Sequence, residues 1–162
     1  MAPWRPAYVG LGSNLEDPRT QVVRAFEELR GLPLTRLMLT SPLYRSRPLG
    51  SVPQPDFINA AAALLTQLEP RALLNELRAI EARHGRPAVH ERWGPRVLDL
   101  DLLSFGDERR VEPDLTLPHP GIPARNFVLY PLADIAPDLD LPGLGRVAEL
   151  AGKVSAEGLA RL

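Results

Sequence analysis

The sequence predicts an α+β fold in which helices pack against a mostly antiparallel β-sheet. Segments with the two-residue alternation of strands and segments with the period of about 3.6 residues of helices follow in the order strand, helix, strand, strand, helix, strand. The chain has 162 residues, of which 44% are hydrophobic, enough for one core but not for two substantial ones. We therefore expect residues 1–162 to form a single domain.

The first strand and the first helix have clear boundaries in the sequence. A strand is expected at residues 4–10, followed by a glycine-containing turn at residues 10–14. Asp17 is suited to the N-cap of a helix, Pro18 to its first position and Gly31 to its end. These signals predict a helix between Pro18 and Gly31.

The next elements complete a repeat of this pattern. Residues 34–46 predict a second strand and residues 57–65 a third, with a proline-rich connection between them. Pro70 opens a second helix with an apolar stripe, and Gly85 closes it. Residues 97–105 predict a fourth strand.

The remaining segments are shorter. Residues 86–95 are polar and contain two prolines, which predicts a mobile loop. Short strands are expected near residues 109–112 and 115–117, and a helix at residues 124–130. The segment after Pro131 is expected to be a connection with weak terminal helices. The whole order is that of the ferredoxin-like βαββαβ unit, with helices on one face of the sheet and later strands extending it.

Composition and charge exclude several classes of function. The net charge of -1 gives no global field that would attract nucleic acid or an anionic membrane. Without cysteine, the chain has no disulfide, thiolate nucleophile or cysteine metal cluster. The first ten residues lack the apolar run of a signal peptide, and no stretch approaches the roughly 18 apolar residues of a membrane span. We expect a cytoplasmic protein.

Two acidic residues alternate with leucines in the fourth predicted strand. The strand period puts Asp99 and Asp101 on one face, roughly 6.6 to 6.8 Å apart along the axis. Magnesium bonds oxygen at about 2.0 to 2.1 Å, so one or two ions fit between such carboxylates. The alternative is a solvated outer face of an amphipathic strand.

The residues just upstream favour the metal-site interpretation. Arg92, Trp93 and Arg96 place two guanidinium groups and an indole beside the acids. Arginine matches phosphate oxygens bidentately, and magnesium usually completes its shell with substrate phosphates. Together they indicate phosphoryl-transfer chemistry, although each arginine alone could be a surface residue and Trp93 a packing residue.

Two common nucleotide motifs are absent. A P-loop needs a lysine after glycine, and the only lysine, Lys153, lacks that context. Gly10 and Gly12 begin a dinucleotide-binding spacing, but Leu15 breaks it, so this segment is assigned a structural role. His119, between two prolines, could be a ligand, an acid or a phosphate contact, or none of these.

The chain resembles the 6-hydroxymethyl-7,8-dihydropterin pyrophosphokinase family from Tyr8 to about Pro137. The most specific motif is the run from Arg92 to Asp101. The other matching segments are Gly10-Leu11-Gly12-Ser13-Asn14, Arg47-Pro48-Leu49-Gly50, Asp56-Phe57-Ile58-Asn59-Ala60, Pro118-His119 and Arg125-Asn126-Phe127.

This resemblance implies an enzyme that transfers the β,γ-diphosphoryl unit of ATP to the pterin hydroxymethyl oxygen and releases AMP in folate biosynthesis. Asp99 and Asp101 would hold two Mg²⁺ ions. Arg86 and Arg96 would stabilise the transferring phosphates, with Arg92 near them.

The resemblance also implies two sets of binding residues. The pterin would contact Ser46, Leu49, Phe57, Asn59, Trp93 and Phe127. The rest of the ATP pocket would be lined by Arg78, Glu81, Leu102, Thr116, His119 and Arg125. Flat heterocycles stack on aromatic rings and an amide offers both donor and acceptor, although Phe57 and Phe127 could also be plain core residues.

Three positions depart from the family pattern. Phe57 replaces a common tyrosine, Ala88 a common loop arginine and Pro120 a common tyrosine. Loss of charge at Ala88 is expected to weaken loop closure over the phosphates. Two other functions stay open: a non-enzymatic ligand-binding module and a magnesium-dependent phosphohydrolase. A monomer is expected.

Overall fold

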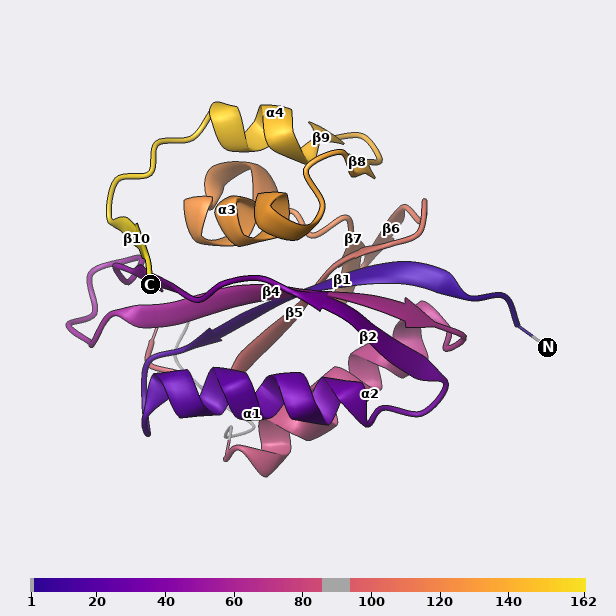
Figure 1. Ribbon diagram of the computed structural model, residues 1–162, viewed down its shortest axis with the longest axis horizontal. Coiled ribbons are helices and arrows are strands. Elements are labelled where there is room, and N and C mark those ends of the chain that lie inside the picture. The colour runs from indigo at the N-terminus through magenta and orange to yellow at the C-terminus, as the bar shows by residue number, and fades with distance from the viewer. Residues whose placement is uncertain (1, 86–93) are drawn as a thin grey trace.

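A computed structural model describes residues 2–85 and 94–162, and in this part of the chain the main sheet has six strands (Figure 1). All the pairs are antiparallel, in the order β10-β3-β4-β1-β5, and β2 also pairs with β4. The strands are β1 (Arg5–Ser13), β2 (Thr35–Thr40), β3 (Tyr44–Ser46), β4 (Phe57–Thr66), β5 (Asp99–Phe105) and β10 (Leu159–Arg161). This is the predicted ferredoxin-like order, which confirms the fold class.

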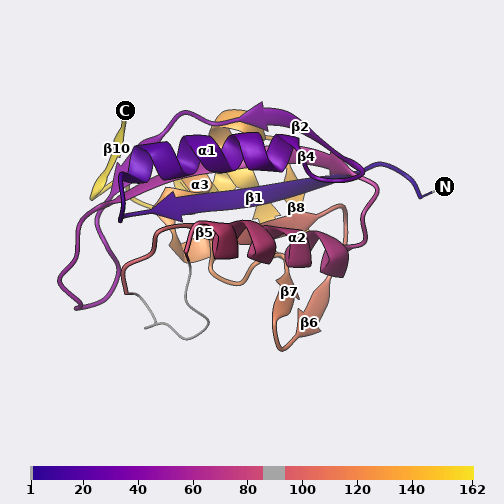
Figure 2. The same ribbon diagram turned by 90° about the horizontal axis from the view of Figure 1, so that it is seen from below.

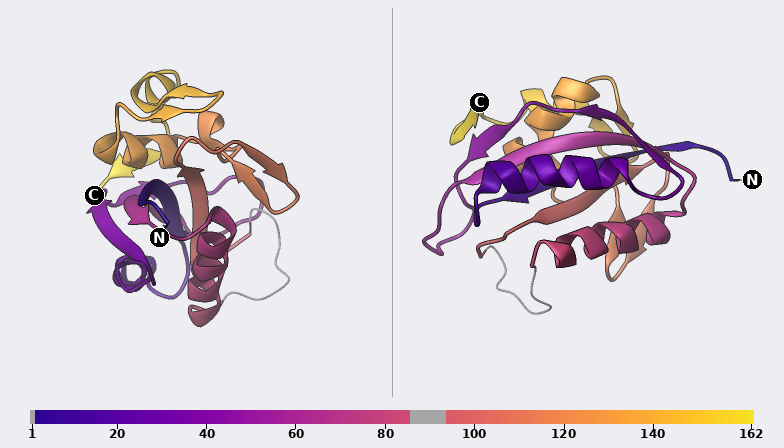
Figure 3. Two further views of the ribbon diagram at one scale, coloured as in Figure 1. Left: turned by 90° about the vertical axis from the view of Figure 1, so that its right-hand side faces the viewer. Right: turned by 60° about the horizontal axis from the view of Figure 1, so that its bottom comes forward.

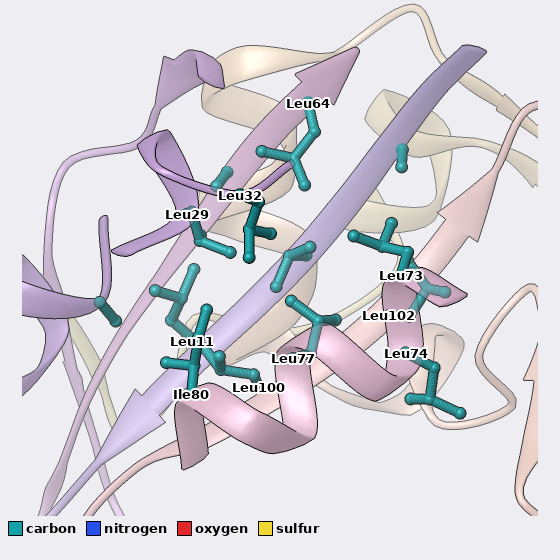
Figure 4. Packing of buried hydrophobic residues seen from close by; sticks show 14 of the residues in the cluster. Leu11, Leu29, Leu32, Leu64, Leu73, Leu74, Leu77, Ile80, Leu100 and Leu102 are labelled. Atoms are coloured by element: carbon teal, nitrogen blue, oxygen red, sulfur yellow. The ribbon is translucent and has the colours of Figure 1, made fainter. Parts of the chain in front are cut away.

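Two long helices cover one face of the sheet, as expected. They are α1 (Pro18–Arg30) and α2 (Pro70–Arg83), and each begins with the proline that the sequence indicated. Leu77 and Ile80 of α2 pack toward Leu11 and Leu100 of the sheet (Figure 4). Replacing Leu77, which is fully buried, with alanine should cost about 2–5 kcal/mol of stability.

The opposite face is covered as well, so the expectation of helices on one face only was wrong. The helices α3 (Asn126–Ile135) and α4 (Val147–Gly152) lie on that side, after the short 3₁₀ turn η1 (Ile122–Ala124) (Figures 1 and 3). The first of them continues through Pro131, where the sequence suggested an end. Proline removes one backbone donor from a helix, but Pro131 and Leu132 are both buried and the helix persists.

The predicted strand at residues 34–46 is two strands in the structure. Both β2 and β3 lie along the same edge of β4, and the residues between them interrupt the ladder. Pro42 has no backbone N–H to donate there. Ser41 replaces the missing pairing, because its side chain accepts a hydrogen bond from the Ala61 N–H at 2.8 Å and its own N–H donates to the Ala61 carbonyl at 2.9 Å.

The later strands extend the main sheet less than expected. A separate hairpin is formed by β6 (Arg110–Glu112) and β7 (Leu115–Leu117), and a second one by β8 (Asp140–Leu141) and β9 (Gly145–Arg146). Figure 2 shows the β6–β7 hairpin projecting from the body near α2. Only β10 among these later strands joins the main sheet, through β3.

The two faces of the sheet have different roles. Val9 and Leu11 of β1 point into the leucine-rich core beneath α1 and α2. Gly10 and Gly12 alternate with them and line a cavity on the other face.

The turn that the sequence predicted at residues 10–14 is mostly strand in the structure, since β1 runs to Ser13. The helices of residues 2–85 and 94–162 include none with the length and apolar character of a membrane span.

Candidate active site

The two acidic residues lie at the start of β5, on the face that carries the cavity. Asp99 pairs in register with Gly12 of β1, and Asp101 pairs with Gly10. The glycines leave room above the strand because they have no side chain. The side chain of Asp101 is 33% exposed. Both carboxylates border two neighbouring cavities and stand at the junction between them.

The first cavity has a volume of about 260 Å³ and is lined by residues of β1, β3, β4, β5 and α3 and of the loops beside them. Its floor is β1 and β4, and α3 forms a wall with Phe127. Of the residues expected at the pterin, the structure brings these to the first cavity: Ser46, Leu49, Phe57, Asn59 and Phe127. The cavity therefore combines two aromatic rings with a polar floor.

A buried hydrogen bond fixes the amide on this floor. The Ser46 hydroxyl donates to Asn59 Oδ1, and both side chains are buried. The Asn59 Nδ2 atom lies close to Gly12, where an added Cβ would come within 3.1 Å of it. The resemblance implied a pterin contact for Ser46, but the sequence gave no signal for this side-chain bond between β3 and β4.

Asn14 is a second residue whose role the sequence did not reveal. It is buried at the end of β1, where its N–H donates to the Arg96 carbonyl at 3.0 Å and its Oδ1 accepts from the Arg96 N–H at 2.9 Å. Its Nδ2 also donates to the Pro55 carbonyl at 2.9 Å. Asn14 thus fixes the backbone of Arg96, whose side chain lines the first cavity. The only signal in the sequence was its place in the Gly10–Asn14 motif.

His119 approaches the carboxylates from the segment after β7. Its N–H donates to the Leu103 carbonyl at 2.8 Å, which attaches this segment to the outer edge of β5. The ring Nδ1 accepts a hydrogen bond from the Gly121 N–H at 3.0 Å, so in the neutral imidazole the proton is on Nε2. That atom lies 4.0 Å from Asp101 Oδ1.

The surroundings of His119 favour its neutral form. Burial lowers the pKa of the imidazole, and the positive charge of Arg125 lowers it further, while Asp99 opposes them. Arg125 itself lines the first cavity, and its guanidinium lies 5.9 Å from the centre of the Phe127 ring. A neutral donor and a cation therefore face the carboxylates from the same side.

The second cavity, of about 320 Å³, opens along the free edge of β5. Helix α2 forms one wall, and the β6–β7 hairpin forms the other. The residues expected at the nucleotide that line it are Arg78, Glu81, Leu102, Thr116 and His119. The predicted pterin residues thus gather in the first cavity and most of the predicted ATP-pocket residues in the second, but Arg96 and Arg125 line the first cavity instead. Both cavities share Asp99, Asp101 and His119.

Two of the residues expected to contact the nucleotide also bind other residues of the protein. Glu81 is buried, and its Oε2 accepts a hydrogen bond from the Leu100 N–H at 2.8 Å, which satisfies a donor on the free edge of β5. Arg78 forms an ion pair with Asp114 of the hairpin at 3.2 Å. Arg86, Arg92 and Trp93 lie outside the described residues, as does the departure at Ala88.

The two carboxylates suit a hard divalent cation that takes some of its ligands from the protein and the others from a substrate. Within residues 2–85 and 94–162, no three His, Asp or Glu side chains gather into a metal site. A Mg²⁺ ion typically takes one or two protein carboxylates and completes its shell with water and phosphate oxygens. Asp99 and Asp101 supply that donor set at the junction of the cavities.

The comparisons with known proteins agree with one another. Residues 8–137 match the model of the 7,8-dihydro-6-hydroxymethylpterin-pyrophosphokinase family. A protein of Pseudomonas aeruginosa named 2-amino-4-hydroxy-6-hydroxymethyldihydropteridine pyrophosphokinase is 52% identical over 96% of this chain and 95% of its own. A protein of the same name from Haemophilus influenzae is 45% identical over 89% of each chain.

Similarity to solved structures extends to the whole fold. A crystal structure of Plasmodium falciparum wild-type HPPK-DHPS with pteroate superposes with a TM-score of 0.78 over 99% of this chain, at 16% identity. Our chain spans 46% of that longer protein. The match to the family model and the two bacterial relatives show that the chain belongs to the 7,8-dihydro-6-hydroxymethylpterin-pyrophosphokinase family.

Proposed function

We propose that the chain transfers the β,γ-diphosphoryl unit of ATP to the hydroxymethyl oxygen of 6-hydroxymethyl-7,8-dihydropterin and releases AMP, a step of folate synthesis. One observation carries the proposal. An aromatic cavity and a polar edge cavity meet at two carboxylates, so a flat heterocycle and a nucleotide triphosphate can approach one another there. Family membership supports the same reaction.

The first cavity suits the pterin. Phe57 and Phe127 would stack on its two faces, and Asn59 would meet its polar edge while Ser46 holds the amide. Main-chain groups of Ser46 and Leu49 would add contacts. The Phe57 ring keeps the stacking surface of a tyrosine but lacks the hydroxyl.

The second cavity suits the nucleoside part of ATP. Leu102 and Thr116 line it together with the half-exposed Arg78 and the buried Glu81. The triphosphate would then run toward the carboxylates. His119 would donate from Nε2 to a phosphate oxygen, because its Nδ1 is already occupied by the Gly121 N–H.

The arginines would stabilise negative charge on the transferring group. Arg96 and Arg125 line the first cavity beside the carboxylates, and Arg86 and Arg92 would join them from the segment outside the described residues. Trp93 would close the pterin side and exclude water.

We propose that Asp99 and Asp101 bind two Mg²⁺ ions. When bound, the metal neutralises phosphate charge and lowers the pKa of the attacking hydroxyl. The protein's own part is positioning: the paired strands fix both carboxylates, and the two cavities fix the substrates in line.

We further propose that residues 1–162 act as one domain and one copy in the cytoplasm. The same sheet supplies residues to both hydrophobic clusters, which supports one domain. Gel filtration at micromolar protein concentration measures the molecular mass in solution. An apparent mass of a dimer would contradict the proposed monomer.

Product analysis tests the reaction. The protein would be mixed with ATP, Mg²⁺ and 6-hydroxymethyl-7,8-dihydropterin, with controls that lack pterin or metal. AMP formed only in the complete mixture supports diphosphoryl transfer. ADP or pterin-independent ATP loss would indicate hydrolysis, and tight binding without any product would indicate a ligand-binding module.

A further inference from the structure

A chain of ion pairs with alternating charge runs along the outside of the second cavity. It joins β1, α2 and the β6–β7 hairpin through consecutive contacts of 2.5 to 3.4 Å between nitrogen and oxygen atoms. In order, its members are Glu69, Arg5, Glu108, Arg110, Glu112, Arg71, Asp114 and Arg78. The last member lines the cavity.

Arg71 is the residue of α2 that contacts two carboxylates of the hairpin, while Arg78 contacts one of them. From the first turn of α2, one of its terminal nitrogens binds Glu112 at 2.5 Å and the other binds Asp114 at 2.9 Å. The hydrogen bond from Arg71 is the main reason that the pKa of each carboxyl lies below its ordinary value. Arg71 therefore contacts both sides of the turn that joins β6 to β7.

This turn has few other attachments to the body. The hairpin is a sheet of its own, and in the described residues it is anchored in the core through Leu115 and Leu117 of β7. The outer strand is solvated, since Val111 is 93% exposed. Pro113 and Asp114, at the turn, nevertheless line the second cavity. Buried Leu115 anchors the β7 end of the turn, and the polar contacts of Glu112 and Asp114 hold the rest of it against α2.

The choice of arginine has a geometric reason. Arg5, Arg110 and Arg71 each bridge two carboxylates. A guanidinium does this with nitrogens held in one rigid plane, whereas the ammonium of lysine is a single point on a flexible stem. Of the 19 basic residues in the chain, only Lys153 is lysine, which fits selection for such bridges.

We propose that Arg71 is a positioning residue for the nucleotide. It fixes the hairpin turn against α2, the turn fixes Asp114, and Asp114 holds the guanidinium of Arg78, a residue that lines the cavity. Arg71 itself is outside the lining of both cavities described above, so it acts through these neighbours. This inference rests on the proposed binding of ATP in the second cavity.

The test compares Arg71→Ala and Arg71→Lys with the parent protein. Calorimetric titration with Mg²⁺ and α,β-methylene-ATP, which is not cleaved between the α and β phosphorus, measures nucleotide affinity apart from turnover. We expect Arg71→Ala to raise the Kd and the KM for ATP about two- to fivefold, with the KM for pterin and kcat unchanged. Arg71→Lys should restore only part of the loss.

Arg146→Ala is the matched control. Arg146 also contacts two carboxylates, at 3.4 and 3.8 Å, and its side chain is 49% exposed against 40% for Arg71, but it lies on the far layer of the molecule. It should leave nucleotide affinity unchanged.

An unchanged Kd in Arg71→Ala would overturn the proposal, and so would an equal loss of pterin and nucleotide affinity, which indicates a general structural effect. If the parent protein binds the nucleotide, Arg71→Ala weakens that binding and no AMP ever forms, the positioning role stands and the proposed reaction fails. If the parent protein does not bind the nucleotide at all, both fail.

Discussion

The two cavities that meet at Asp99 and Asp101 are built in different ways. The first lies over the middle of the sheet, and its polar floor consists of buried groups such as Asn59 and Ser46. The second lies at the free edge of β5, and a small hairpin held by exposed ion pairs forms its outer wall. One cavity is thus built on buried core groups, and the wall of the other depends on surface contacts.

This difference has an energetic consequence. A buried polar group that loses its partner costs about 1–3 kcal/mol, whereas an exposed ion pair typically contributes about 0–1 kcal/mol. Substitutions in the first cavity should therefore change binding strongly, and those around the hairpin should adjust it by smaller steps. The variants below test the contrast from the largest expected effect to the smallest.

The largest effect is expected where the cavities meet. Asp101→Ala or Asp99→Ala should lower kcat by about a thousandfold or more, because the metal would lose half of its protein ligands. The fold should persist, since both side chains are partly exposed. Steady-state kinetics and circular dichroism measure the two quantities. Asp107→Ala, an exposed acid in the turn after β5, is the control, and near-normal activity of Asp101→Ala would refute the metal assignment.

The aromatic wall of the first cavity should give the next largest effect. Phe127→Leu keeps an apolar side chain of smaller area but removes the ring. Loss of one stacking partner should weaken pterin binding by about ten- to a hundredfold, while nucleotide affinity changes little. Fluorescence titration with the pterin measures the first and calorimetry the second. Equal losses for both ligands would mean that Phe127 is a general core residue.

The floor of the first cavity offers a finer test. Ser46→Ala removes the donor that fixes Asn59, and we expect the KM for pterin to rise about three- to tenfold. Ser41→Ala removes a buried hydroxyl that binds Ala61 on the other half of the same β4 edge. It should reduce the Tm without a change in the KM for pterin. If both variants change that KM alike, the bond to Asn59 has no special role.

The smallest effect is expected from Tyr44, which is buried and neighbours Asn59 across β3 and β4. Burial raises its pKa to about 12, and its hydrogen bond to Asp134 contributes. Because the folded pKa is above the unfolded value of 10.0, the contribution to stability is complete below pH 10 and is lost as the pH rises toward about 12.

Tyr44→Phe should therefore lose less stability than the parent protein between about pH 10 and 12. Denaturant unfolding at several pH values in this range measures how steeply the free energy of unfolding falls with pH. Burial also raises the pKa of Tyr8, but Tyr8 is present in both proteins, so the difference between the two slopes reports Tyr44. Identical slopes for the two proteins would contradict the assignment.

Local patterns in the sequence were enough for much of the fold. Helices α1 and α2 begin at Pro18 and Pro70 as predicted, because a proline at the first helical position and an apolar stripe are local signals. Asp17, expected as the N-cap, forms no capping hydrogen bond with its side chain. The side of the sheet to which α3 and α4 pack is a tertiary property and was missed. The break at Pro42 and the helix through Pro131 were also missed, since each depends on a distant partner or on burial.

The site shows the same division. The two-residue period of a strand predicted that Asp99 and Asp101 share one face of that strand, without any knowledge of the fold. The hydrogen bonds of Asn14 and Ser46 cross residues far apart in the sequence, and the ion pairs of Arg71 join a helix to a hairpin about 40 residues away. Such contacts leave no periodic signal, so only the folded structure reveals them.

The central claim is that the molecule offers separate, adjoining sites for pterin and nucleotide. It is tested most directly by titrating 6-hydroxymethylpterin into protein that is saturated with Mg²⁺ and α,β-methylene-ATP. We predict that the pterin still binds, with one molecule of each ligand per chain. Displacement of the nucleotide by the pterin would show that the two ligands share one cavity and would contradict this account.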